Sequence, residues 1–217
     1  MAAEPTSTPR SELPDVSDEV ERLRGLERQH ATEEAWSWIT HLQQQLQGNR
    51  PGAEDATAAL FAAGEPSRGI DGQTDGMLVG WVAPRPFTRV LRPITRVWLP
   101  WQGKHFVAAE DRGTNLLTRS ARLPAKLPWP LYRTRPAENG RWAFEFETRV
   151  EPDALGGAQD VLVIDYKPVK DNPRLIIRSV RDELVWVAGG VHIGRVLLRM
   201  PNGSHHNTAY FALREQG

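Results

Sequence analysis

The 217-residue sequence predicts a mainly β fold, an antiparallel sandwich or β-barrel preceded by an N-terminal helical arm. Three observations favour it. Strand-like segments follow one another closely in the second half, turn residues separate most of them, and no helix-length pattern intervenes. The segments are Trp142–Thr148, Asp160–Tyr166, Arg174–Val180, Glu183–Val187, Val191–Met200 and Asn207–Arg214. Such an order is typical of an antiparallel meander, and a barrel of few strands holds one small ligand or fills itself with side chains.

The composition indicates a globular chain and excludes several kinds of site. Hydrophobic residues make up 40% of the chain, and 27 lysines and arginines balance 27 acidic residues, so no net charge favours nucleic acid. The chain has no cysteine, which excludes disulfides, thiolate metal sites and cysteine nucleophiles. We expect a cytoplasmic protein, because the first residues lack the apolar core of a secretory signal. We expect no membrane span, because no stretch approaches the roughly 20 apolar residues of such a helix.

The N-terminal region predicts two parts. Residues 1–15 are rich in Pro, Ser, Thr and Ala, which is typical of a disordered leader. Residues 16–50 form the expected helical arm, with Ser17 as its N-cap, and Gly25 divides the arm in two, with Thr32 as the second N-cap. We expect the arm to cover one end of the barrel. An arm that binds a partner, and a homodimer, stay open as alternatives.

The barrel domain is expected to span residues 54–217. It opens with a short helix at Ala56–Ala63, which Gly64 ends. Two proline-containing segments interrupt the first strands: Pro86–Leu99 fits a kinked helix or two short turns, and Leu123–Tyr132 fits a long loop or lid. The strands expected around these segments are Met77–Ala83, Gly103–Ala109 and Asn115–Arg119.

Two groups of residues carry a family resemblance. The glycine-rich segment Gly72–Gly80 precedes an apolar stretch and then Trp101-Gln-Gly-Lys-His-Phe106, which resembles the N-terminal part of the GXWXG-type bacterial proteins. The run from Arg181 through Val191–Arg195 to Tyr210–Leu213 resembles uncharacterised actinobacterial proteins that are similar to lipocalin-like, calycin-type barrels. The resemblance covers roughly Leu60 to Arg214. It implies a lipocalin-like barrel and no specific activity, because fold alone does not give function.

Aromatic residues on the expected strands are candidates to line a ligand cavity. Trp142, Phe144 and Phe146 alternate with charged residues, which predicts one buried aromatic face. A solid core is the alternative interpretation. The lining candidates are Trp81, Trp142, Phe144, Phe146, Trp186 and Tyr210.

Asp165 and Arg178 are candidate polar anchors for such a ligand. Asp165 shares a strand face with two valines, so its carboxylate lies in the cavity if that face points inward. The alternative is a strand-end aspartate that caps the turn at Lys167. Arg178 would anchor a ligand carboxylate if it points inward. Its neighbours Arg181, Asp182 and Glu183 favour surface ion pairs around a turn instead.

Histidine and lysine residues suggest further chemistry. His192 shares a face with Gly194, which leaves space beside it, and in nitrobindin relatives of this fold a barrel histidine ligates haem iron. No second haem motif accompanies His192, so we expect no cofactor and no metal, and we keep His192 as a polar anchor. Lys104 could form a Schiff base in a hydrophobic mouth, although nothing in the spacing requires it.

The sequence therefore predicts a protein that binds a small hydrophobic or aromatic molecule in a barrel cavity. The expected ligand is apolar with one polar group, such as a polyketide, fatty acid or isoprenoid product. The alternative is a cyclase-type enzyme, for example a pericyclase in natural-product biosynthesis, which needs little beyond a shaped cavity and one or two polar groups. A third alternative is a structural or regulatory module that uses the arm. The sequence assigns no catalytic residue.

Overall fold

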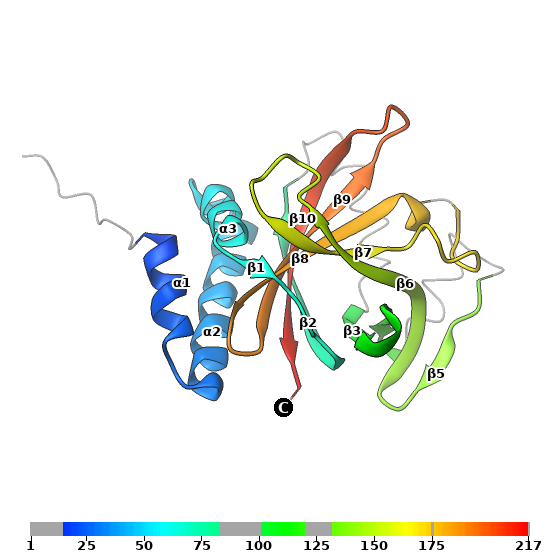
Figure 1. The fold of residues 1–217 in the computed structure, drawn as a ribbon, viewed down its shortest axis with the longest axis horizontal. Coiled ribbons are helices and arrows are strands. Elements are labelled where there is room, and N and C mark those ends of the chain that lie inside the picture. Colours follow the sequence, from blue (N-terminus) through cyan, green and yellow to red (C-terminus); the bar gives the residue numbers. More distant parts are fainter. Residues whose placement is uncertain (1–14, 83–100, 120–131, 175, 217) are drawn as a thin grey trace, which may run out of the picture.

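The computed structural model describes residues 15–82, 101–119, 132–174 and 176–216. Its described part is a closed antiparallel β-barrel with a layer of helices packed against one side (Figure 1). Eight strands pair in the order β8-β7-β6-β4-β3-β2-β10-β9, and β9 pairs with β8 again to complete the ring. The prediction of a mainly β barrel with a helical arm is confirmed.

The barrel strands are β2 (Gly72–Trp81), β3 (Trp101–Val107), β4 (Arg112–Leu117), β6 (Gly140–Pro152), β7 (Asp160–Asp165), β8 (Val180–Ala188), β9 (Val191–Arg199) and β10 (His205–Glu215). Outside the ring, β1 (Glu65–Pro66) pairs with β8 and β5 (Arg135–Ala137) pairs with β6. Short 3-10 helices, η1 (Ala108–Glu110) and η3 (Ile177–Ser179), lead into β4 and β8.

The strand predicted at Arg174–Val180 is wrong, and so is the turn expected at Arg181 and Asp182. The first segment contains η3, and β8 runs without interruption from Val180 to Ala188. Successive side chains of a strand point to opposite faces, so Asp182 leaves the wall on one side and its two charged neighbours on the other. All three are buried, so the expected surface ion pairs are also wrong.

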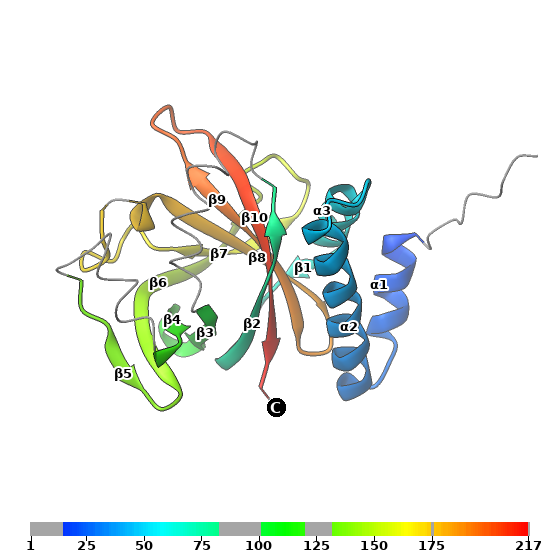
Figure 2. The same cartoon turned by 180° about the vertical axis from the view of Figure 1, so that it is seen from behind.

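The arm consists of α1 (Val16–Arg24) and α2 (Arg28–Gln47), and α3 (Ala53–Ala62) follows it. Asp15 caps α1 by accepting a hydrogen bond from the Ser17 amide, and Glu27 caps α2. The caps predicted at Ser17 and Thr32 are therefore wrong, because both residues lie inside their helices. α2 packs along β2 and also contacts β8, β9 and β10, so the helices cover the side wall of the barrel and not its end, where the sequence predicts them (Figures 1 and 2).

The barrel wall separates two apolar cores. The outer core lies between helices and wall, where Ala35 and Ile39 of α2 join Val185 of β8. The inner core fills the barrel with side chains such as Ile164 and Leu184. On β7 the valines face the outer core, and Leu162, Ile164 and the following Tyr166 face the inner one.

Some predicted segments fall on other parts of the chain. The kinked helix at Pro86–Leu99 lies outside the described residues, as do all but the last residue of the loop at Leu123–Tyr132 and all but the last residue of the leader 1–15. Among the described helices, none has the length and apolar character needed to cross a membrane.

Candidate functional site

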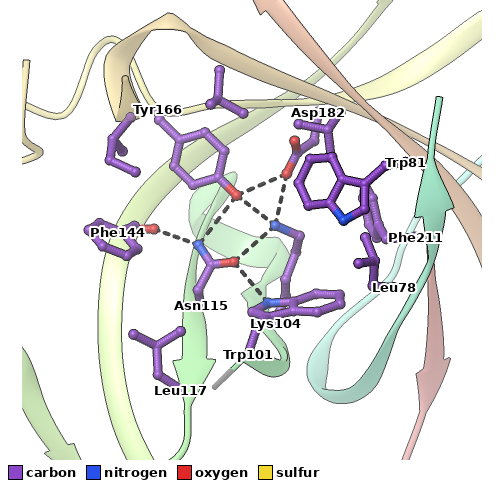
Figure 3. A pocket seen from close by; sticks show the side chains of 13 residues that line it. Leu78, Trp81, Trp101, Lys104, Asn115, Leu117, Phe144, Tyr166, Asp182 and Phe211 are labelled. Atoms are coloured by element: carbon purple, nitrogen blue, oxygen red, sulfur yellow. Dashed lines mark hydrogen bonds and ion pairs between the residues drawn. The ribbon is translucent and has the colours of Figure 1, made fainter. Parts of the chain in front are cut away.

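A cavity of about 130 Å³ lies within the barrel, and its lining is mostly apolar (Figure 3). The apolar lining comes from Leu78, Trp81, Trp101, Leu117, Phe144, Ile177, Val180, Val196 and Phe211. Four lining residues carry polar groups that meet one another: Lys104, Asn115, Tyr166 and Asp182. We call these four residues the inner cluster.

A bulge in β3 brings Trp101 and Lys104 to the same cavity. Residues three apart on a regular strand point to opposite faces. Here the register shifts between Trp101 and Gly103, so both side chains face inward. Gly103 has a φ of 154°, and a Cβ at this position would lie 1.9 Å from the carbonyl oxygen of Thr74. The glycine therefore permits the bulge that places the lysine.

Lys104 lies at the centre of the inner cluster and is 2% exposed. Its Nζ donates to Asn115 Oδ1 at 3.0 Å, to the Tyr166 hydroxyl at 2.6 Å and to Asp182 Oδ2 at 2.9 Å. An ammonium carries three protons, and each has an acceptor here. Asn115 is the direct partner of Lys104 across the β3–β4 ladder, which explains their contact.

The other polar atoms of the inner cluster are also paired, with one exception. The Tyr166 hydroxyl donates to Asp182 Oδ2 at 2.9 Å, and Asn115 Nδ2 donates to the carbonyl oxygen of Phe144 at 2.9 Å. Trp101 Nε1 donates to Asn115 Oδ1 at 3.1 Å. Asp182 Oδ1 is buried and has no hydrogen-bond partner among the described residues. Within the described part of the chain, the inner cluster thus has one acceptor atom, Asp182 Oδ1, that is free to bind a ligand.

The surroundings of Lys104 act on its ammonium proton in opposite directions. Nζ lies 5.2 to 5.7 Å from the ring centroids of Phe146, Tyr166, Phe211 and Trp101. Burial lowers the pKa of Lys104, and the charge of Asp182 opposes this effect. Burial also raises the pKa of Tyr166 well above 10, so its hydroxyl stays protonated near neutral pH.

Trp81 and Phe144, two of the predicted lining residues, line this cavity, and Phe146 lies beside it under Lys104. The predicted alternation of Trp142, Phe144 and Phe146 is wrong. Phe144 has a φ of 53°, and the β4–β6 register shifts next to it. Trp142 therefore lies in a separate outer groove, 5.4 Å from the ring of His105.

Trp186 and Tyr210 lie away from the cavity. The guanidinium of Arg24 in α1 lies 4.8 Å from the Trp186 ring centroid, and the indole Nε1 donates to the carbonyl oxygen of Gly189. Tyr210 belongs to the outer core, where its ring lies 6.5 Å from that of Phe61.

Asp165 and Arg178 make local contacts outside the cavity. Asp165 Oδ1 accepts a hydrogen bond from the Lys167 amide at 2.9 Å, which is the turn cap named above as the alternative. Its Oδ2 pairs with Arg149 at 3.0 Å. Arg178 Nε donates to the carbonyl oxygen of Lys167 at 3.0 Å. The structure thus places neither of them beside the inner cluster.

His192 lies in a chain of three polar side chains. Its Nδ1 is 2.8 Å from Ser67 Oγ, and its Nε2 is 2.9 Å from Glu215 Oε1. The order serine, histidine, carboxylate is that of a hydrolytic triad. Ser67 is only 1% exposed and lines none of the described cavities, so it offers no accessible nucleophile. The space expected beside Gly194 is filled by the ring of Phe211.

The described residues contain no group of three His, Asp or Glu side chains that could hold a metal ion. The inner cluster supplies one lysine and one carboxylate, which suits hydrogen bonding and proton transfer better than metal binding. Sequence reasoning named Lys104 without ranking it and missed Asn115, Tyr166 and Asp182 as site residues. The alternation of β7 gave a signal, because Tyr166 shares its face with two large apolar residues.

Comparisons with known proteins add little. No family model and no curated protein matches the sequence. A solved structure described as a protein from Thermomonospora curvata is 14% identical, with a TM-score of 0.43, over 82% of this chain and 98% of that one. A likeness this distant carries no argument. The lipocalin-like and GXWXG-type resemblances stay predictions.

Proposed function

We propose that the barrel binds a small apolar or aromatic molecule whose one polar group contacts the inner cluster. The observation that carries this proposal is the spare oxygen of Asp182 on a buried polar cluster beside an otherwise apolar cavity. A buried polar atom without a partner costs roughly 1–3 kcal/mol. A ligand that supplies the missing contact removes this cost, and the apolar lining holds the rest of the molecule.

The size of the cavity limits the part of the ligand that it encloses. An engineered apolar cavity of roughly 150 Å³ in another protein takes up benzene. The cavity of about 130 Å³ therefore suits one ring or a short chain. Benzyl alcohol is a suitable probe, because it combines one ring with one hydroxyl.

Tryptophan fluorescence tests the proposal, because Trp81 and Trp101 line the cavity. We expect benzyl alcohol to quench the wild type in a saturable way and to quench W81F and W101F less. W186F is the matched control, since Trp186 does not line the cavity and should leave the quenching unchanged. Quenching that is absent, or that persists equally in W81F and W101F, would contradict the proposal.

A cyclase-type enzyme is the second candidate. Lys104 and Tyr166 place proton donors within 3 Å of the carboxylate acceptor of Asp182, which offers acid and base groups on one side of an apolar mould. Product analysis with short polyene substrates would test it. Turnover should fall in Y166F while benzyl alcohol still quenches that variant, whereas an equal loss of both would indicate a binding role alone.

A further inference from the structure

Lys104 differs in type from the two buried arginines in the described part of the chain, Arg181 and Arg195. The sequence has 23 arginines and four lysines, so arginine supplies most of its positive charge. Lys126 lies outside the described residues, and Lys167 and Lys170 are exposed. An arginine stays charged at any relevant pH, whereas a lysine can lose its proton and act as a nucleophile. Position 104 at the cavity is thus occupied by a lysine, the basic residue that can act as a nucleophile.

We propose that Lys104 captures an aldehyde or ketone ligand as an imine. This inference rests on the proposed function and names its polar group as a carbonyl. Lys104 lines the cavity, and its Nζ contacts both a carboxylate and a phenol, which can take up and return the protons that move during imine formation (Figure 3).

The reaction balances without any other reactant. The Lys104 ammonium gives one proton to Asp182 along their 2.9 Å contact and becomes a free amine. The amine attacks the carbonyl carbon, so a C–N bond forms and the C=O π bond breaks. Tyr166 gives its proton to the new alkoxide and takes one from the nitrogen, which leaves a neutral carbinolamine. The hydroxyl then leaves as water with the proton held by Asp182, and nothing is oxidised or reduced.

The product keeps the positive charge of the starting lysine and one of its three N–H donors. A protonated imine keeps one positive charge at Nζ, beside the carboxylate of Asp182 and the surrounding aromatic rings. The apolar lining keeps bulk water from the C=N bond and so slows its hydrolysis. Burial also lowers the pKa of Lys104, which increases the fraction of free amine near neutral pH.

Reductive trapping tests the proposal. Full-length protein is incubated with benzaldehyde near neutral pH and reduced with borohydride, and peptide mass spectrometry locates the benzyl groups. An exposed lysine is mostly protonated near neutral pH and therefore reacts slowly there. We expect at least a tenfold preference for Lys104 over Lys167 and Lys170, and we expect benzyl alcohol to protect Lys104. K104R should lose the label in that peptide, and the double variant K167R/K170R should keep it.

The outcomes separate this inference from the proposed function. Saturable quenching by benzyl alcohol, with label only on the exposed lysines, would overturn imine formation and leave noncovalent binding in place. Failure of benzyl alcohol to quench would contradict the binding proposal itself. If K104R does not fold, D182N decides instead, because it keeps the lysine and removes the proton acceptor. Its labelling of Lys104 should fall by at least tenfold, and unchanged labelling would contradict the role of Asp182.

Discussion

Neighbouring charged residues on the two faces of β8 differ in how completely they are paired. Arg181 and Glu183 face outward and belong to what we call the outer network, together with Glu151, Asp153 and Arg195. Asp182, between them in sequence, belongs to the inner cluster. Both groups are ion pairs buried in the same wall, so their difference lies in how completely each one is paired.

The outer network is complete around Glu183, which is fully buried. Glu183 Oε1 accepts from Arg181 Nε at 2.9 Å and from the Ala154 amide at 3.1 Å. Its Oε2 accepts from Arg195 Nε at 2.9 Å and from Arg195 Nη2 at 2.6 Å. Asp182 has its contacts on one oxygen and none from described residues on the other. We infer that the outer network holds the fold together, while the inner cluster is arranged for a ligand.

The largest expected effect is on the outer network. E183Q keeps the shape of the side chain and removes the charge that two buried arginines share. Breaking a buried pair from one side costs about 3–5 kcal/mol, because a charge is left uncompensated. Urea unfolding should show this loss in the free energy of unfolding, while quenching by benzyl alcohol stays at the wild-type level in the folded fraction. A loss below that of D182N would contradict the structural role of Glu183.

The contrast between the two faces also explains what the sequence could predict. Short strand-like segments, the turn residues between them and the helical spacing of the arm follow from local chemistry, so the barrel and the helical arm were predictable. Three consecutive charges at Arg181 to Glu183 look like a turn when read locally. Only tertiary pairing, which satisfies both faces, allows them to sit inside a strand.

The sequence did not predict the inner cluster, for a related reason. The bulges at Gly103 and Phe144 break the period of two on which face assignments rest. One bulge brings Trp101 and Lys104 to a common face, and the other separates Phe144 from Trp142. Long-range pairing sets the register of these strands, so their sequences alone do not give the faces.

A second variant closes the cavity without touching a polar group. A Cβ added at Gly194 would lie 2.3 Å from the ring of Phe211, which lines the cavity, so in G194A this ring must move. Overpacking of this kind costs about 1–3 kcal/mol. We expect weaker quenching by benzyl alcohol together with a modest loss in urea unfolding. Unchanged affinity in G194A would argue that the ligand binds elsewhere.

A third test removes the inner charges as a pair. K104M/D182N takes away both charges of the Lys104–Asp182 contact and leaves an oxygen that can still accept from Tyr166. Replacing both partners of a buried ion pair is often neutral, so we expect a free energy of unfolding within about 1 kcal/mol of the wild type. Each single variant should be less stable than the double variant. Imine trapping should disappear, and a double variant that loses as much stability as E183Q would erase the contrast between the two groups.

The smallest effect near neutral pH, and the last that we predict, concerns Tyr166. Burial raises its pKa well above 10, so the folded state holds this proton more tightly than the unfolded chain does. The contribution of Tyr166 to stability is therefore fully present below about pH 10 and is lost as the pH rises through the folded-state pKa. Between pH 7 and 9 the free energies of unfolding of the wild type and Y166F should differ by a constant amount. Above pH 10 the wild type should lose stability faster than Y166F, and its tyrosinate absorbance should rise together with unfolding. An early rise in tyrosinate absorbance while the barrel is still folded would show that water reaches the inner cluster, and the burial that distinguishes it would then be wrong.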